Sequence, residues 1–203
     1  MKVIRTASSE WREHLVFLGA LMRNPRSVGA IAPSSIQLAR ELSQHVTPGS
    51  RVIELGPGTG VVTRELLART GGGGMLLAVD TDRTFVERIR RAWPEIDCVC
   101  ASAETLPVLT AERGWADVEH IVSGLPFASL PVATTRLILD GVHQVLRVGG
   151  TFTTFQYLHA YRMPPAAAFR RALSARLGCQ PSSRIVFRNV PPAFVLSWRR
   201  LAH

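Results

Sequence analysis

From residue 51 onward, short apolar runs alternate with longer amphipathic ones, and this alternation constrains the fold more than any other feature of the sequence. Short apolar runs bounded by glycine or polar residues are typical of buried strands, whereas apolar residues three and four positions apart are typical of helices. Strands are expected over 51–55, 75–80, 96–100, 117–122 and 150–155, and helices over 59–70, 82–93 and 131–146. The alternation predicts an α/β domain in which helices cover both faces of a parallel sheet.

Further elements are expected on both sides of this alternation. Apolar residues at helical spacing predict a helix over 9–22, and a loop rich in proline and glycine separates it from a second helix over 35–46. Another helix is expected over 165–177. Two β-rich segments, 184–190 and 193–200, flank a Pro-Pro pair and predict an antiparallel hairpin that closes the sheet.

The length and composition of the chain favour a single structural unit. With 203 residues, of which 46% are hydrophobic and 19% charged, the chain is long enough to bury a core and lacks the composition of a disordered protein. We expect residues 1–48 to form an N-terminal helical segment and residues 49–203 to form the main domain.

The charge balance is strongly basic, with 24 basic against 15 acidic residues and a net charge of +9. Lys2 is the only lysine, so arginine carries nearly all of the positive charge. Nucleic acid, an anionic membrane surface and an acidic small substrate are all compatible partners. Arginine usage without functional meaning is an equally good explanation.

The cysteines and the apolar runs limit the compartment and the cofactors. Cys98, Cys100 and Cys179 are odd in number, which favours a reducing compartment. Their spacing gives no zinc signature, so we expect no metal. The longest apolar stretch near the N-terminus, residues 15–22, is far shorter than a bilayer span, and we expect the chain to be neither exported nor transmembrane.

A glycine-rich loop follows the first expected strand. The strand Arg51-Val52-Ile53-Glu54-Leu55 runs directly into Gly56-Pro57-Gly58-Thr59-Gly60. Glycines between a strand and a helix let a ligand approach the backbone at the helix N-terminus. The spacing is G-x-G-x-G, not the G-x-G-x-x-G of dinucleotide-binding folds, and an acidic residue precedes it. This pattern resembles motif I of class I methyltransferases.

The resemblance implies S-adenosylmethionine as cofactor and S-adenosylhomocysteine as product. It also implies a Rossmann-like fold with a mostly parallel seven-stranded sheet, helices on both faces and a C-terminal antiparallel hairpin. The loop would pass under the amino-acid part of the cofactor, so its predicted ligands are Glu54, Gly56, Gly58, Thr59 and Gly60.

Two later strand ends complete the predicted cofactor site. Asp80 ends the second strand, where a carboxylate can accept hydrogen bonds from both ribose hydroxyls; capping of the next helix is a better explanation for Asp82 than for Asp80. In class I methyltransferases the segment after the third strand holds the adenine ring, and this chain has Ser102 where the family usually has Asp. Either Ser102 or Glu104 is therefore expected to hold the adenine amino group. The predicted ligands from these and the next strand end are Asp80, Thr81, Ser102, Ala103, Glu104 and Ser123.

The loop after the fourth expected strand is Ser123-Gly124-Leu125-Pro126-Phe127. It resembles the N-L-P-[FY] motif of rRNA adenine dimethylases, in which the Asn side chain accepts a hydrogen bond from the exocyclic adenine amine. This chain has Gly124 at that position. A planar, weakly basic nucleobase amine would lose its partner there, whereas an aliphatic amine, already a good nucleophile when neutral, needs only positioning.

Several segments taken together are similar to the bacterial phospholipid N-methyltransferases, which convert phosphatidylethanolamine to phosphatidylcholine. They are residues 25–35, the glycine-rich loop, the loop from Ser123 to Phe127, Phe155-Gln156-Tyr157 and Asn189-Val190-Pro191-Pro192-Ala193. The resemblance extends from about Phe17 to Trp198. It implies a phospholipid substrate at an anionic membrane surface, no nucleic-acid partner and a cytoplasmic protein bound peripherally to the inner face of the cytoplasmic membrane. No protein partner is indicated.

The family's association with membranes is attributed to its N-terminal helix, which here is the helix expected over 9–22. An apolar helix face followed by arginines fits an interfacial helix beside anionic headgroups. The residues predicted to contact the membrane are Trp11, Leu15, Leu18, Arg23 and Arg26. The alternative is a helix that only covers the sheet. The helix has both roles in turn if it lies over the bound cofactor and opens when it meets a membrane.

The expected reaction is in-line methyl transfer to the headgroup amine, up to three times. Positive charge moves from sulfur to nitrogen, so the site must mainly position a neutral amine, which first has to lose its proton. Tyr157 is expected to orient or deprotonate the amine, and Ser123 is a further expected catalytic residue. Phe127 is expected to form an aromatic wall that stabilises the methylated ammonium, and His159 to be a surface residue.

Three alternatives stay open at this point. An RNA adenine N6-dimethyltransferase is supported by Leu125-Pro126-Phe127 and by the basic charge, but Gly124 and the short stretch after the fifth core strand, residues 156–203, disfavour it. The others are a methyltransferase of small soluble amines or quinones, and an inactive S-adenosylmethionine-binding protein that docks on membranes.

Overall fold

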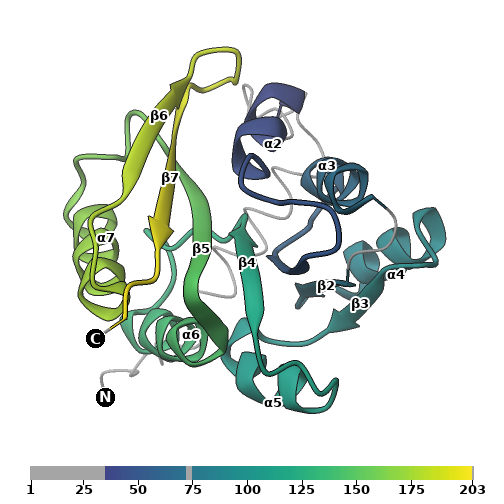
Figure 1. The fold of residues 1–203 in the computed structure, drawn as a ribbon. Coiled ribbons are helices and arrows are strands. Elements are labelled where there is room, and N and C mark those ends of the chain that lie inside the picture. The colour runs from purple at the N-terminus through teal and green to yellow at the C-terminus, as the bar shows by residue number, and fades with distance from the viewer. Residues whose placement is uncertain (1–34, 72–74, 203) are drawn as a thin grey trace, which may run out of the picture.

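The computed structural model describes residues 35–71 and 75–202, in which seven strands form one sheet (Figure 1). The strands are β1 (Arg51–Leu55), β2 (Met75–Asp80), β3 (Asp97–Cys100), β4 (Val118–Ser123), β5 (Leu146–Tyr157), β6 (Ser182–Val186) and β7 (Ala193–Arg199). The helices are α2 (Ile36–Leu42), α3 (Val61–Thr70), α4 (Arg83–Ala92), the 3₁₀ helix η1 (Ala103–Thr105), α5 (Leu106–Ala111), α6 (Val132–Val145) and α7 (Pro164–Leu177).

The strand order is β3-β2-β1-β4-β5-β7-β6. Strands β1 to β5 pair in parallel, and β7 pairs antiparallel with both β5 and β6. The predicted fold, a mostly parallel seven-stranded sheet closed by a C-terminal hairpin, is therefore confirmed.

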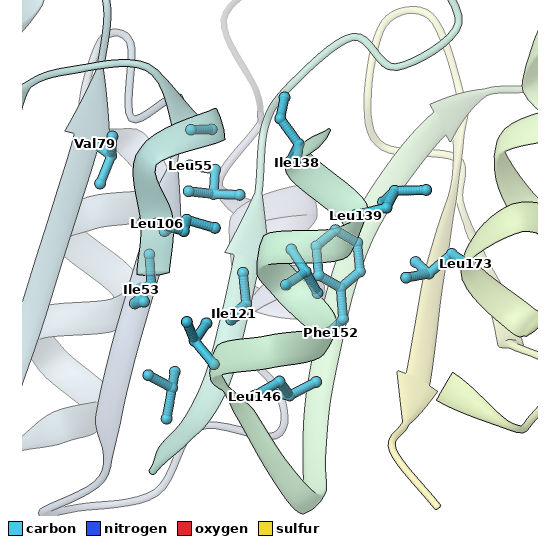
Figure 2. Packing of buried hydrophobic residues seen from close by; sticks show 14 of the residues in the cluster. Ile53, Leu55, Val79, Leu106, Ile121, Ile138, Leu139, Leu146, Phe152 and Leu173 are labelled. Carbon is cyan, nitrogen blue, oxygen red and sulfur yellow. The ribbon is translucent and has the colours of Figure 1, made fainter. Parts of the chain in front are cut away.

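Each face of the sheet is buried by its own layer of helices. On one face, Ile53, Ile121 and Phe152 belong to a core that includes residues of η1, α5, α6 and α7; Figure 2 shows strand side chains meeting those of α6 and α7. On the other face, Val52 and Val122 pack with residues of α2, α3 and α4. Burial on both faces explains why these strands read as nearly continuous apolar runs.

An aromatic cluster fixes the hairpin and α7 to the first of these faces. Phe152 and Trp198 meet edge to face with ring centroids 6.1 Å apart, and Phe169 meets Trp198 at 6.0 Å. The Trp198 indole nitrogen donates to Ser174 Oγ at 2.9 Å, so its one polar atom is satisfied. Each such aromatic pair contributes about 0.5–1.5 kcal/mol beyond the burial of its surface.

The hairpin differs from the prediction in its first strand, which covers 182–186 instead of 184–190. The strand stops because Asn189 is used in the turn: its Nδ2 donates to the Pro191 carbonyl at 2.8 Å and its Oδ1 accepts from the Ser35 amide at 2.9 Å. A side chain that satisfies backbone groups locally competes with a strand ladder.

Two helix predictions also need correction, and one cannot be compared. The helix expected over 35–46 ends at Leu42, and η1 with α5 was not predicted. Helix α5 has six residues with proline in its first turn, too few to show a helical period. The helix expected over 9–22 lies outside the described residues. Within the described residues, no helix is long and apolar enough to cross a membrane.

Candidate active site

The strand order reverses between β1 and β4, and ligands of open α/β sheets bind at the carboxyl ends of the strands beside such a reversal. Leu55 and Ser123, which end these two strands, are register partners. The glycine loop (residues 56–60) and the Ser123 loop (residues 123–127) therefore leave the sheet side by side. Two of the sequence motifs that we singled out thus lie together.

The glycine loop needs its glycines for backbone reasons. Gly56, Gly58 and Gly60 have φ values of 72°, 51° and 85°, a region that residues with a Cβ rarely adopt. A Cβ on Gly60 would lie 2.7 Å from the Trp93 ring and 2.9 Å from the Ile89 side chain. The start of α3 is therefore packed directly against α4, and the loop backbone lies at the carboxyl end of β1.

The Ser123 loop touches the glycine loop backbone to backbone. The Gly124 amide donates to the Leu55 carbonyl at 2.8 Å, and a Cβ on Gly124 would lie 2.8 Å from the Gly56 carbonyl oxygen. Leu125 packs against Gly56 from the same loop, with 3.1 Å between its Cδ2 and the position of a Gly56 Cβ. A side chain at position 124 would force the two loops apart.

Glu54 lies behind the glycine loop as a buried carboxyl group without a partner. It is 1% exposed, and neither carboxyl oxygen has a hydrogen-bond partner among the described residues. Burial raises the pKa of Glu54 to about 8, although the nearby Thr63 opposes the shift. Such a group is costly unless a ligand completes it, so its chemistry fits a cationic group bound over the loop.

Asp80 connects the glycine loop to the start of α4. Its Oδ2 accepts from the Gly58 amide at 3.3 Å and its Oδ1 accepts from the Asp82 amide at 2.9 Å. Burial raises the pKa of Asp80, although these amide hydrogen bonds oppose the shift. Each oxygen keeps lone pairs that a ribose hydroxyl can use. Asp82 caps α4 by accepting from the Thr84 amide, as its sequence position indicated.

The residues predicted around the adenine and ribose follow the ends of β2 and β3. Ser102 caps η1, because its Oγ accepts from the Glu104 amide at 3.2 Å. Ala103 is buried, Glu104 is half-buried and Thr81 is exposed. The cap leaves Glu104 as the freer of the two groups considered for the adenine amine.

The side chains of Ser123 and Phe127 are both buried and make contacts within the protein. The Ser123 side chain is buried and accepts from the Leu125 amide at 3.2 Å. Phe127 is 6% exposed, and its ring stacks on Phe169 with centroids 4.3 Å apart. The ring is packed between the sheet and α7, and the aromatic wall expected at Phe127 stays a prediction.

Tyr157 is the last residue of β5 and lies at the same edge of the sheet. Since Thr154 pairs with Ser123, Tyr157 is three residues further along, about 10 Å beyond that level. It packs on the same side of the sheet as α2 and α3, with its ring edge-on to Phe155 at 5.3 Å and parallel to His159 at 5.7 Å. Burial raises the pKa of the Tyr157 hydroxyl.

Three residues with a structural part in the site were not given one from the sequence. Trp93 packs against Gly60, Asn189 links the hairpin turn to α2, and the buried Thr63 hydroxyl, like Glu54, has no partner among the described residues. Thr63 lies three residues after Gly60 on α3. Its position one helical turn after the glycine loop could have identified it from the sequence. The predicted membrane contacts Trp11, Leu15, Leu18, Arg23 and Arg26 lie outside the described residues.

Comparison with known proteins indicates which reaction the site supports. A sequence model of the family described as "Methyltransferase domain" matches residues 52–150, the stretch from β1 to β5 that contains both loops. The ornithine lipid N-methyltransferase of Singulisphaera acidiphila is 29% identical over 146 residues, which is 70% of this chain and 76% of that protein.

Two further matches come from other substrate classes. The ribosomal RNA small subunit methyltransferase A of Thiobacillus denitrificans is 37% identical over 83 residues, 41% of this chain, and this chain spans only 31% of its length. The structure of the Burkholderia thailandensis 1,6-didemethyltoxoflavin-N1-methyltransferase with S-adenosylhomocysteine has a TM-score of 0.69 at 20% identity, covering 100% of this chain and 94% of that one. The chain is an S-adenosylmethionine-dependent methyltransferase with the class I, Rossmann-like fold.

Proposed function

We propose that this enzyme methylates the amine of a membrane lipid, converting phosphatidylethanolamine through its mono- and dimethyl forms to phosphatidylcholine. The similarity to an ornithine lipid N-methyltransferase over 76% of that protein supports a lipid amine as substrate. Ornithine lipid is accordingly the second candidate, since it also carries an aliphatic amine at a membrane surface.

The close contact between Gly124 and Gly56 is the observation that favours an aliphatic amine over a nucleobase as the methyl acceptor. An Asn at position 124 would begin with a Cβ 2.8 Å from the Gly56 carbonyl oxygen, so the loops as packed leave no room for it. The group that would hold an adenine amine is absent, and its place is taken by loop backbone. An alkylamine needs no such side chain, because its nitrogen is already a strong nucleophile once it is neutral.

The residues at the carboxyl ends of the strands are proposed to bind different parts of the cofactor. S-adenosylmethionine supplies a methyl group on a positively charged sulfonium. In this proposal Glu54 balances positive charge beneath the glycine loop, and Asp80 accepts from the ribose hydroxyls. Glu104 is proposed for the adenine amine, with Ser102 holding η1 in place, and Thr59, Thr81, Ala103 and Ser123 complete the cradle.

Tyr157 is proposed to orient the substrate amine instead of deprotonating it. Because burial raises the pKa of its hydroxyl, the phenol stays protonated at neutral pH and offers an oxygen that accepts a hydrogen bond from the amine. The proton of the ammonium form then leaves to solvent before each transfer. Catalysis rests on holding a neutral amine in line, which is catalysis by positioning.

Residues 1–48 are proposed to act as a membrane-binding or lid segment for the catalytic unit formed by residues 49–203, with the protein attached peripherally to the inner face of the cytoplasmic membrane. The variants Leu15→Glu/Leu18→Glu and Arg23→Glu/Arg26→Glu should both reduce flotation with anionic vesicles. Equal flotation and equal lipid methylation by wild type and both variants would leave this segment only a covering role.

The substrate is tested by incubating the enzyme with labelled cofactor and four acceptors in parallel: phosphatidylethanolamine vesicles, ornithine lipid vesicles, ribosomal RNA and soluble amines. Label in phosphatidylethanolamine is expected. Label in ornithine lipid alone would move the proposal to the second candidate. Label in RNA or soluble amine, or in none, would overturn it.

A Gly124→Asn variant sharpens the same experiment. It should lose lipid methylation without gaining RNA methylation, because its side chain displaces the Gly56 loop. Gly114→Asn is the matched control, since a Cβ at Gly114 meets nothing within 4 Å. RNA methylation by Gly124→Asn would show that position 124 alone selects the nucleobase, contrary to the steric argument.

A further inference from the structure

The turn between β6 and β7, residues 187–192, extends the sheet at the edge where the candidate site lies. Tyr157 and Val186 both pair with Ala193, on opposite sides of β7, and the Leu158 amide donates to the Pro192 carbonyl at 2.9 Å. In Figure 1 the turn lies at the top of the view, beyond the end of β5. It is the neighbour of Tyr157 at the outer side of the site.

The β6–β7 turn exposes two large apolar side chains. Phe187 is 72% exposed and Val190 is 60% exposed, and Leu158 beside them is 41% exposed. Single exposed apolar residues are common on protein surfaces and need no explanation. Here an aromatic and a branched side chain stand on one short turn next to a third, which is the arrangement of an interaction surface.

The buried residue between them makes the turn a firm support. Asn189 is 2% exposed and is held at both ends, by the Pro191 carbonyl and by the Ser35 amide at the start of α2. With Asn189 directed inward, its neighbours Arg188 and Val190 are left exposed. The exposure of the apolar side chains is therefore built into the turn.

The stretch of sequence that contains the β6–β7 turn is basic. From residue 141 to the end, the sequence contains nine arginines and neither aspartate nor glutamate: Arg147, Arg162, Arg170, Arg171, Arg176, Arg184, Arg188, Arg199 and Arg200. Arg184 is paired with Glu41 at 3.3 Å, whereas Arg188 in the turn and Arg162 in the segment after β5 are exposed. A surface of anionic phosphates would be attracted here.

Apolar tips flanked by arginines fit the boundary between lipid headgroups and acyl chains. An aromatic and an aliphatic side chain gain by entering the acyl region, while guanidinium groups stay at the phosphate level. Each arginine near an anionic leaflet adds to the attraction, which falls off over a Debye length of about 8 Å at physiological salt. A protruding turn of this kind matches a fluid surface better than a flat protein partner.

We infer that the β6–β7 turn is a second membrane-docking element, separate from the N-terminal segment, and that its occupant is an anionic lipid bilayer. Phe187 and Val190 enter the headgroup boundary and Arg188 contacts phosphate, which brings the Tyr157 edge of the site to the bilayer surface. The inference rests on the proposed function in one respect, that the methyl acceptor is a lipid.

The test compares flotation of the 203-residue chain with vesicles of phosphatidylcholine alone and with vesicles that also contain phosphatidylglycerol as an anionic lipid. Phe187→Ser/Val190→Ser should partition at least about tenfold more weakly than wild type, about 1.4 kcal/mol. Arg188→Gln should weaken binding only to the anionic vesicles and only at low salt. Val148→Ser/Leu201→Ser is the matched control, since these residues are 54% and 47% exposed at the opposite edge of the sheet.

A second readout covers the case in which the double variant folds poorly. Phe187→Trp keeps a large ring, and its fluorescence should be quenched by brominated lipid acyl chains more strongly than that of wild type. Calorimetric binding of S-adenosylhomocysteine checks that each variant keeps its fold.

The outcomes separate the docking element from the substrate proposal. Methylation of a short-chain, soluble phosphatidylethanolamine should be equal in wild type and turn variants, while methylation of vesicles falls with flotation. If no protein methylates lipid but the turn variants still lose flotation, the substrate proposal fails and the docking element stands. Three results would overturn the docking element. One is equal flotation of wild type, turn variant and control, and another is quenching of the Phe187→Trp variant no stronger than that of wild type. The third is a turn variant that loses RNA binding in place of lipid binding.

Discussion

Two glutamates at opposite ends of the strands differ in whether they have a hydrogen-bond partner. At the amino edge, where the strands begin, Glu119 accepts from the Arg51 amide at 2.6 Å and lies 3.8 Å from Arg147. His120 is also paired there, with 2.8 Å between its Nδ1 and Thr151 Oγ1. At the carboxyl edge, Glu54 is buried with no partner among the described residues.

The difference shows how one sheet separates stability from function. Glu119 and His120 at the amino edge have partners within the fold and need no ligand. An unpaired buried carboxyl group costs stability, and a protein keeps it where a ligand offsets that cost. The glycines do not divide in the same way: a Cβ on Gly60 or Gly124 at the carboxyl edge, or on Gly150 at the amino edge, would lie within 2.9 Å of a neighbour, whereas one on Gly149 would meet nothing within 4 Å.

The largest effect is expected from Gly60→Ala. Its positive φ would cost about 1–2 kcal/mol with a Cβ, and the contact with Trp93 at 2.7 Å adds about 1–3 kcal/mol of overpacking. Thermal unfolding should show a loss of about 2–5 kcal/mol, the sum of these two costs. Gly149→Ala, with a φ of 78° and open space, should show only the backbone part. Equal losses of unfolding free energy in the two variants would mean that the contact of Gly60 with Trp93 adds no cost to the substitution.

Asp80→Ala should act on ligand binding more than on stability. Losing a charged acceptor in a ligand site costs about 1.5–3 kcal/mol, a tenfold to hundredfold loss of affinity. Calorimetry with S-adenosylhomocysteine measures it directly. Glu119→Ala, which removes a carboxylate of the amino edge, should leave that affinity unchanged and lower the unfolding temperature. Unchanged affinity in Asp80→Ala would remove the ribose assignment.

The sequence predicted the sheet well because its strands are buried on both faces and joined by helices with a clear period. The glycine loop and Asp80 were also readable, since backbone strain and strand ends leave local signals. Helix α5 left none, because six residues do not complete a helical pattern.

What the sequence could not predict depends on contacts between distant segments. The hydrogen bond from Ser35 to Asn189 joins residues 154 positions apart, and it decides where β6 ends. The sequence also did not predict that the Phe127 ring stacks on Phe169 of α7. Only tertiary packing determines which face a loop aromatic takes.

The stability of the ligand-free protein should fall as pH rises through neutrality, opposite to the usual behaviour of carboxylates. The pKa of Glu54 is about 8 in the fold against 4.5 in the unfolded chain, so the folded state holds a proton that the unfolded state has lost. Between about pH 6.5 and 8 this lowers the unfolding free energy by up to about 2 kcal/mol, or several degrees of Tm.

The control variants isolate that carboxyl group. Glu54→Gln should flatten the pH dependence, and the raised pKa of Asp80 gives any slope that it contributes the same sign. Burial lowers the pKa of His120 to about 4, so this residue is neutral in the folded state throughout the window and adds only a small opposite slope near its lower end. A stability that rises steadily across the window in the wild-type protein would contradict the unpaired state of Glu54.

The smallest effect is expected from Tyr157→Phe, and it sharpens the comparison within the carboxyl edge itself. The proposed cofactor cradle is built from the ends of β1, β2 and β3 and, through Ser123, of β4, whereas Tyr157 ends the next strand, β5. Losing one neutral hydrogen bond to the amine costs about 0.5–1.5 kcal/mol, so kcat should fall about two- to tenfold while affinity for S-adenosylhomocysteine stays the same. Because the raised pKa keeps the phenol neutral, the pH dependence of kcat should keep its shape in the variant. If the variant no longer showed the rise of kcat with increasing pH that the wild type shows, Tyr157 would instead be the base, and an equal loss of cofactor affinity would make it structural. His159→Ala is the matched control, because it removes the ring stacked on Tyr157 at 5.7 Å and leaves the hydroxyl in place.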